Sequence, residues 1–194
     1  MEATKAERIL GNGLSEQLVR ACQEGSPEAF RQLYELYKGK VYSLAAYMTG
    51  DTEMAKDLTQ EIFLKASRDI RAFRFKSSFS SWLYRLATNT CLNALRGRRS
   101  RGEVSIEDAL ETTVWMDPNG SPEQQQMNQQ TQRAVREAML ALKPPLRAVV
   151  VLRYVEDLSY GEIAEALSCS EGTVASRLSR AHRLLERKLS SWKE

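Results

Sequence analysis

Apolar residues recur along most of the chain at intervals of three and four, which is the spacing of amphipathic α-helices. The longest series covers about six turns after Ser26-Pro27. Its apolar members are Phe30, Leu33, Tyr34, Tyr37, Val41, Leu44, Ala45 and Met48. A shorter helix is predicted before it, from Ser15 to a stop at Gly25, with residues 1–14 as a mobile start. These patterns predict an all-α protein.

The next predicted helix, over residues 52–70, has two faces of different character. The inward face carries Ala55, Leu58, Ile62 and Ala66, and the outward face carries Asp57, Gln60, Glu61 and Leu64. A leucine among carboxylates and an amide on an exposed face is more than solubility requires, so this face is a candidate surface for docking a partner. An ordinary solvated acidic face would show the same pattern.

Aromatic and basic residues mix in the following segment, which predicts a loop over residues 74–79 and then a helix that begins at Ser80 or Ser81. The interior face of this helix carries Leu83, Leu86, Ala87, Thr90 and Ala94. The loop and the other side of the helix hold candidate contacts to single-stranded nucleic acid: Arg74, Lys76, Ser77, Phe79, Trp82, Arg85, Asn89, Asn93 and Arg96. Rings can stack on flipped bases, amides can bond to base edges, and cations can meet phosphates. A protein–protein surface could also use Trp and Arg.

Helical periodicity is lost from Gly97, where turn formers and mixed charge predict a linker over residues 98–120 with one short helical turn near Ile106. Roughly 25 extended residues span on the order of 80 Å, so the parts on either side can occupy separate sites. The predicted fold is therefore two small helical domains, residues 15–97 and 121–194, joined by a flexible linker.

Residues 159–189 predict two helices joined by a tight turn. Ser159 and Glu162 form a capping box for the first helix, and Ser170 can cap the second. On the second helix Val174, Leu178, Ala181 and Leu185 face inward, opposite Thr173, Ser176, Arg177, Arg180 and Arg183. Hydroxyl and guanidinium groups backed by an apolar stripe suit a recognition helix in a DNA major groove, as in a helix-turn-helix. An amphipathic helix with a solvated basic face would look similar.

Composition narrows the choice of function. The net charge of +3 argues only weakly for nucleic acid, although arginines cluster near residues 96–101 and 177–187. No apolar run reaches the ~20 residues that span a bilayer, and the chain start lacks a signal-peptide core, so a cytoplasmic protein with no membrane insertion is expected. The three cysteines and the single histidine, His182, show no metal-ligand spacing. Neither a cofactor, a metal nor a catalytic residue is predicted, and the protein is not expected to be an enzyme.

Three motifs together resemble one known family, the bacterial RNA polymerase sigma factors of the extracytoplasmic-function (ECF) type. They are A-x-D-L-T-Q-E-I-F-L over residues 55–64, F-S-S-W-L-Y-R-L-A-T-N over residues 79–89, and L-S-Y-G-E-I-A-E-A-L followed by E-G-T-V-x-S-R-L-x-R-A over residues 158–181. The resemblance covers about residues 15–190. Two local differences stand out: Ala175 replaces a basic residue common in relatives, and Phe75 replaces a small residue in the loop.

The resemblance implies a role for each candidate surface. Asp57, Gln60, Glu61 and Leu64 match the surface that docks on the coiled coil of the polymerase β′ subunit. The loop over residues 74–79, with Asn89 and Asn93, matches the capture site for a melted minus-10 strand. The helix from Glu171 matches the reader of the minus-35 duplex, with Arg177 and Arg180 as its main contacts. Further implied partners are the polymerase β flap, promoter DNA and an anti-sigma factor.

The predicted function is therefore a sigma factor that confers promoter specificity on core RNA polymerase and helps to open the DNA. A helix-turn-helix regulator that acts on duplex DNA without joining the polymerase is the main alternative, and it would not need the surface around Leu64. A module that only sequesters a partner is a third class, and it would leave the stripe of Asn and Arg side chains unused.

Overall fold

The computed structural model describes the chain over residues 2–101 and 122–190. Every regular element in those two ranges is a helix, in agreement with the all-α prediction. The helices are α1 (Glu2–Gln23), α2 (Pro27–Thr49), α3 (Thr52–Asp69), a 3-10 turn η1 (Ile70–Ala72), α4 (Phe79–Ser100), α5 (Pro122–Leu140), α6 (Pro144–Tyr154), α7 (Tyr160–Leu167) and α8 (Glu171–Ser190). The short turn predicted near Ile106 lies outside the described residues.

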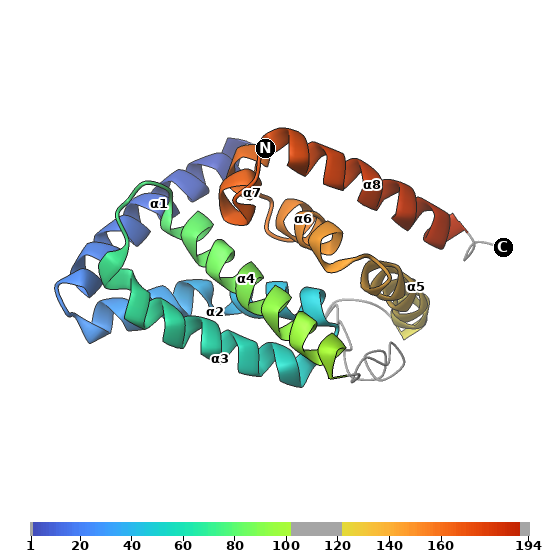
Figure 1. Cartoon of the computed structure of the whole chain (residues 1–194), viewed down its shortest axis with the longest axis horizontal. Helices are drawn as coiled ribbons and strands as arrows, with labels where there is room; N and C mark the ends of the chain where they lie inside the picture. The colour runs from blue at the N-terminus through green and yellow to red at the C-terminus, as the bar shows by residue number, and fades with distance from the viewer. Residues whose placement is uncertain (1, 102–121, 191–194) are drawn as a thin grey trace.

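Helices α1 to α4 pack around one apolar core (Figure 1). Its fully buried side chains include Val19, Leu33, Val41, Leu44, Met48, Ile62 and Leu83. The four predicted inward residues of α3 are all buried, while its outward face is exposed. The hydrophobic period therefore predicted the orientation of this helix correctly, because burial of the apolar stripe is the main source of the helix's stability.

Two helix starts differ from the prediction. Helix α1 begins at Glu2 and continues through Gly13 and Ser15, where the sequence predicted a new start. The Ser15 hydroxyl lies 2.9 Å from the Tyr37 hydroxyl and is buried, so it serves packing between α1 and α2 rather than a cap. A glycine in a helix interior costs only about 1 kcal/mol, which the helix formers around it offset. Helix α4 starts at Phe79 because Ser78 caps it by accepting a hydrogen bond from the Ser81 backbone N–H at 3.1 Å.

Helices α5 to α8 form the second unit, in which α7, a tight turn and α8 make the predicted helix-turn-helix. The Ser159–Glu162 capping box is present, with the Ser159 backbone N–H donating to Glu162 at 2.8 Å. Ser168 ends α7 in the left-handed conformation, φ 50°. Ser170 then caps α8 by accepting from the Thr173 backbone N–H at 3.2 Å. The two capping predictions are confirmed, since both depended only on neighbours in the sequence.

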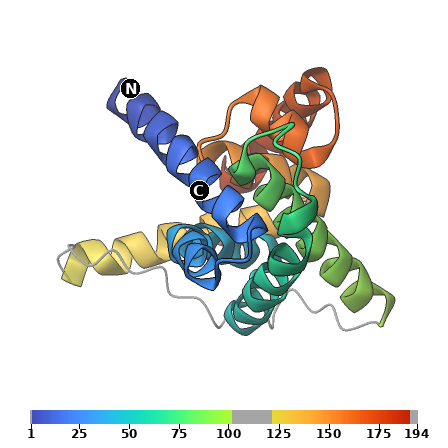
Figure 2. The ribbon, with the colours of Figure 1, turned by 90° about the vertical axis from the view of Figure 1, so that its left-hand side faces the viewer.

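The second unit packs directly on the first. Helix α4 lies between α3 on one side and α7 on the other, and α6 lies against α2 (Figures 1 and 2). Tyr84 of α4 donates a hydrogen bond to Glu156 at 2.6 Å. Burial raises the pKa of the Glu156 carboxyl, and the bond from Tyr84 acts in the opposite direction. Tyr84 and Thr88 of α4 are buried, although the sequence pattern assigned them to neither face of this helix.

One buried arginine joins the two units. Arg147 of α6 donates to the carbonyl oxygen of Met139 in the last turn of α5 at 3.0 Å and to that of Leu142, just after the end of α5, at 3.1 Å. It also donates to the carbonyl of Met48 in the last turn of α2. Burial lowers the pKa of Arg147 to about 10, so the side chain stays cationic at neutral pH. A single cation thus satisfies carbonyls at the C-terminal ends of two helices, where helix dipoles favour positive charge.

Candidate polymerase and nucleic-acid interfaces

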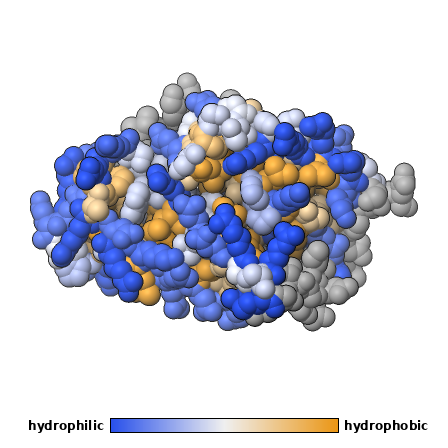
Figure 3. All heavy atoms as spheres, viewed as in Figure 1, coloured by the Kyte–Doolittle hydropathy of each residue, from blue (hydrophilic) through white to orange (hydrophobic). Residues whose placement is uncertain are grey.

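The outward face of α3 is an exposed mixed surface, as predicted. Asp57, Gln60 and Glu61 are exposed, and the Leu64 side chain is 59% exposed. Lys65 holds the Glu61 carboxylate in an ion pair on the next turn. The face of the molecule seen in Figure 3 is mainly hydrophilic, with hydrophobic atoms showing between charged groups. An apolar leucine ringed by polar side chains matches the anatomy of a docking site, in which a small apolar centre has a polar rim.

The loop before α4 is anchored from α1. The Gln23 side-chain amide donates to the carbonyls of Ile70 at 2.9 Å and Phe73 at 2.7 Å. Three aromatic rings then gather: the Phe73 ring centre lies 4.9 Å from that of Phe75 and 5.5 Å from that of Trp82. The rings stabilise a loop that has few backbone hydrogen bonds of its own, so the loop has a defined shape in the folded chain.

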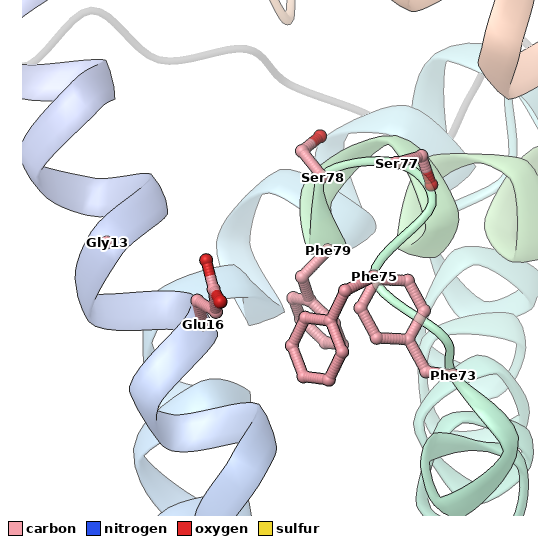
Figure 4. A pocket seen from close by; sticks show the side chains of 7 residues that line it. All are labelled: Gly13, Glu16, Phe73, Phe75, Ser77, Ser78 and Phe79. Atoms are coloured by element: carbon pink, nitrogen blue, oxygen red, sulfur yellow. The ribbon is translucent and has the colours of Figure 1, made fainter.

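A cavity of about 280 Å³ opens between this loop and α1 (Figure 4). Its lining residues are Gly13, Glu16, Phe73, Phe75, Ser77, Ser78 and Phe79. Ser77 and Phe79 were predicted as contacts, whereas Glu16, Phe73 and Phe75 were not. The density of phenylalanines in the loop was the one sequence signal for the aromatic walls. The part played by α1 had no signal, because it depends on a contact between segments about 60 residues apart.

The remaining predicted contacts to a melted strand fall into two groups. Arg74 and Lys76 of the loop and Arg85, Asn89, Asn93 and Arg96 of α4 are exposed. Trp82 is half-buried because its ring packs against Phe79, with ring centres 5.5 Å apart. The Phe79 side chain is only 5% exposed. A polar stripe therefore runs along α4, formed by Arg85, Asn89, Asn93 and Arg96. Phe79 and Trp82 belong to the aromatic scaffold beside it.

The recognition helix presents the predicted side chains on one side. Val174, Leu178 and Ala181 are buried, and Ser176, Arg180 and Arg183 are exposed. Leu185, predicted to face inward, is half-buried. Thr173 and Arg177 are half-buried as well, and the Thr173 hydroxyl lies 2.9 Å from that of Ser170. Of the three predicted arginine contacts, Arg180 and Arg183 are therefore more accessible to a DNA groove than Arg177.

A wide groove of about 960 Å³ runs beside these arginines. Its apolar lining comes from Ala141, Pro145, Leu146 and Leu184, and its cationic lining comes from Lys143, Arg177, Arg180, Arg183 and Arg187, with Glu186 as one carboxylate among them. The groove joins the α5–α6 turn to α8 and concentrates positive charge that was spread along the sequence. Such a surface favours anionic partners, including the DNA backbone.

Two of the three cysteines lie in the interior, away from these surfaces. Cys22 and Cys91 are buried, and burial raises the pKa of the Cys91 thiol to about 12, which keeps it protonated and unreactive. Over residues 2–101 and 122–190, no group of His, Cys, Asp and Glu is arranged to hold a metal ion. In the same ranges, no helix has both the length and the apolar character to cross a membrane.

Comparison with known families and relatives agrees with this geometry. The Sigma-70 region 2 model matches residues 33–101, and the Sigma-70 region 4 model matches residues 132–185. The ECF RNA polymerase sigma-E factor of Haemophilus influenzae is 36% identical over 177 residues, covering 89% of this chain and 93% of that protein. The chain belongs to the family of ECF RNA polymerase sigma factors.

Other relatives support the same assignment. The ECF RNA polymerase sigma factor SigW of Bacillus subtilis is 31% identical, over 88% of this chain and 94% of its own. Among solved structures, the sigma factor RpoE of Bartonella quintana, in complex with the anti-sigma factor NepR, has a TM-score of 0.66 at 24% identity. It covers 83% of this chain and 96% of its own. CnrH, in complex with the cytosolic domain of CnrY, has a TM-score of 0.67 at 23% identity, over 92% and 98% of the two chains. These two structures share the fold.

As an ECF sigma factor, the chain directs promoter-specific initiation by RNA polymerase. Region 2 begins in α2 and takes in α3, the aromatic loop and α4. Region 4 contains the end of α5 and the helix-turn-helix. Arg147 and the Tyr84–Glu156 hydrogen bond therefore connect region 4 to region 2 in this sigma factor.

Proposed function

We propose that this sigma factor reads a promoter at two points while its α3 surface holds it on core RNA polymerase. The α3 surface, Asp57, Gln60, Glu61 and Leu64, docks on the β′ coiled coil. The loop and the α4 stripe capture the melted minus-10 strand, and α8 reads the minus-35 duplex. The observation that carries the proposal is that one chain exposes the α3 surface, with its 59% exposed leucine, the polar residues of α4, and two arginines of α8, Arg180 and Arg183. The sigma factor acts as a non-catalytic subunit in the cytoplasm.

Strand capture is an exchange of interactions. Unstacking a base costs a few kcal/mol. Stacking on protein rings contributes about 1–3 kcal/mol per base, and neutralised phosphates add to it. The stripe supplies amide groups at Asn89 and Asn93 and cations at Arg85 and Arg96. Arg96 donates to the Asn93 side-chain oxygen at 3.0 Å, which orients that amide on the exposed side of α4.

Promoter reading requires regions 2 and 4 to separate. The minus-10 and minus-35 elements lie about 25 base pairs apart, or about 85 Å at 3.4 Å per base pair. Region 4 packed on α2 and α4 cannot reach both elements together.

The proposal is tested by in vitro transcription with purified core polymerase on a library of random promoters. A sigma factor yields transcripts whose start sites share two spaced motifs. A helix-turn-helix regulator would bind duplex DNA and produce no transcript with core polymerase alone. A sequestering module would do neither, so each of these two results would overturn the proposal.

Replacing Arg180 with alanine is expected to cost about 1–3 kcal/mol of minus-35 recognition, because an exposed guanidinium that can meet a guanine edge or a phosphate is lost. Holoenzyme affinity for duplex fragments with intact and scrambled minus-35 elements measures the effect. Arg133→Ala, at an exposed arginine of α5, is the matched control. Equal affinities of the wild type and Arg180→Ala for the intact element would place the reading residues elsewhere.

Replacing Asn89 with alanine is expected to slow formation of the open complex more than it weakens duplex binding, because Asn89 meets only the melted strand. Permanganate reactivity of melted thymines follows the opening. Gln32→Ala removes an exposed amide on α2 and serves as the control. Unchanged permanganate reactivity in Asn89→Ala would count against the capture role of α4.

Negative control by an anti-sigma factor is also part of the proposal. The sigma factor RpoE of Bartonella quintana was solved in complex with one. In this chain, the cationic groove beside α8 and the exposed Leu64 surface are accessible to such a partner in the packed state. The β flap of the polymerase is the second partner proposed for region 4.

A further inference from the structure

The backbone at Phe75 is unusual. Phe75 has φ 55°, in the left-handed region that only glycine visits without cost. This chain therefore keeps a bulky ring at a strained backbone position. Strain of this kind persists where the surrounding structure holds it, and it gathers at functional sites.

The Phe75 ring is held from α1. The Arg20 guanidinium lies over the ring, 4.3 Å from its centre, and Phe73 meets the ring edge-on. Arg20 in turn bonds to the Glu16 carboxylate at 2.7 Å, one turn earlier on α1. Glu16 and Phe75 both line the 280 Å³ cavity, on opposite sides of its mouth in Figure 4. Helix α1 therefore shapes a cavity in the loop proposed to capture a base.

We propose that Phe75 is a stacking platform for the captured base and that Glu16 makes the cavity prefer a base with an exocyclic amine over thymine. This inference rests on the proposed capture of the melted strand. Aromatic walls from Phe73, Phe75 and Phe79 suit the faces of a base. An ionised carboxylate only accepts hydrogen bonds, and each of its oxygens accepts more than one, so Glu16 can bond to Arg20 and to a base amine together.

Thymine is the base that this arrangement disfavours. Its single ring N–H is flanked by two carbonyl oxygens, which would face the carboxylate and repel it. Cytosine, adenine and guanine each carry an amino group that donates to a carboxylate, as Asp and Glu do toward the cytosine amine in duplex DNA. Replacement of Glu16 by glutamine adds an amide donor, which can meet the thymine oxygens and should remove the preference.

The experiment uses the holoenzyme and promoter fragments with a premelted minus-10 segment, carrying each of the four bases in turn at every melted position. Phe75→Gly is expected to lower affinity for these fragments about tenfold, because one base stack is lost. On the thermal midpoint of the free protein, loss of the ring contacts to Phe73 and Arg20 and relief of the left-handed strain act in opposite directions, so the midpoint should change little. A residue that only packed the loop would lose stability without any loss of affinity for the premelted fragments. Glu16→Gln should keep the affinity for amine-bearing bases within about twofold and raise that for thymine.

Asn89→Ala separates failure of this inference from failure of the proposed function. If Asn89→Ala weakens binding to the premelted fragments and Phe75→Gly does not, the capture site stands and the stacking role is overturned. If neither substitution matters, strand capture by region 2 is overturned as well. Equal binding of all four bases by the wild type would overturn the role of Glu16 alone.

Discussion

Replacement of Arg147 by methionine is expected to destabilise the folded sigma factor by about 3–4 kcal/mol. Methionine fills most of the space but cannot donate to the buried carbonyls of Met139, Leu142 and Met48. Each buried acceptor left unpaired costs about 1–3 kcal/mol, and burial of the apolar side chain offsets only part of the sum. Urea denaturation followed by circular dichroism measures the change in the free energy of unfolding.

Arg133→Met is the matched control. Its guanidinium forms an exposed ion pair with Glu137 on α5, so the same substitution there should change the free energy of unfolding by less than about 0.5 kcal/mol. Equal, small losses in both variants would mean that Arg147 does not support the ends of α5 and α2. A large loss of unfolding free energy confined to Arg147→Met would also show that the stability of region 4 depends on a side chain that bonds to region 2 as well.

Replacement of Leu64 by aspartate is expected to weaken binding to core polymerase by at least 2 kcal/mol, or about 30-fold. Leu64 is the apolar centre of the α3 surface. An aspartate in its place would make all four residues of the surface polar and leave no apolar group for the partner to contact. The side chain is 59% exposed, so the fold should lose little stability. Fluorescence anisotropy with labelled sigma factor and purified core polymerase gives the affinity.

Leu36→Asp supplies the comparison, since Leu36 is a 46% exposed leucine on α2 outside the α3 surface. Its affinity for core polymerase should match that of the wild type. Similar weakening by both variants would indicate a general effect of added charge, and no weakening by Leu64→Asp would move the docking surface away from α3. Thermal unfolding of both variants excludes misfolding as the cause.

The sequence predicted those features that depend on near neighbours. The inward face of α3, the Ser159–Glu162 capping box and the cap at Ser170 follow from residues within one or two helical turns, and the structure has all three. The exposure of Leu64 and Arg180 also followed, because a helical wheel needs only the period. The predicted start of α1 was wrong because it used local sequence alone. Ser15 has the chemistry of a cap, but in the structure its hydroxyl bonds to the Tyr37 hydroxyl of α2.

Only the tertiary structure decided features that join distant segments. By itself the sequence determined an all-α chain with an exposed acidic face on α3, a polar stripe on α4 and a helix-turn-helix, because periodicity and capping are local. It carried no signal that Tyr84 would bond to Glu156, that Arg147 would reach Met48 nearly a hundred residues away, or that α1 would complete the cavity at Phe75. Those contacts depend on how two units pack, and their free energy comes from burial and from carbonyls that find a donor only after the chain has folded.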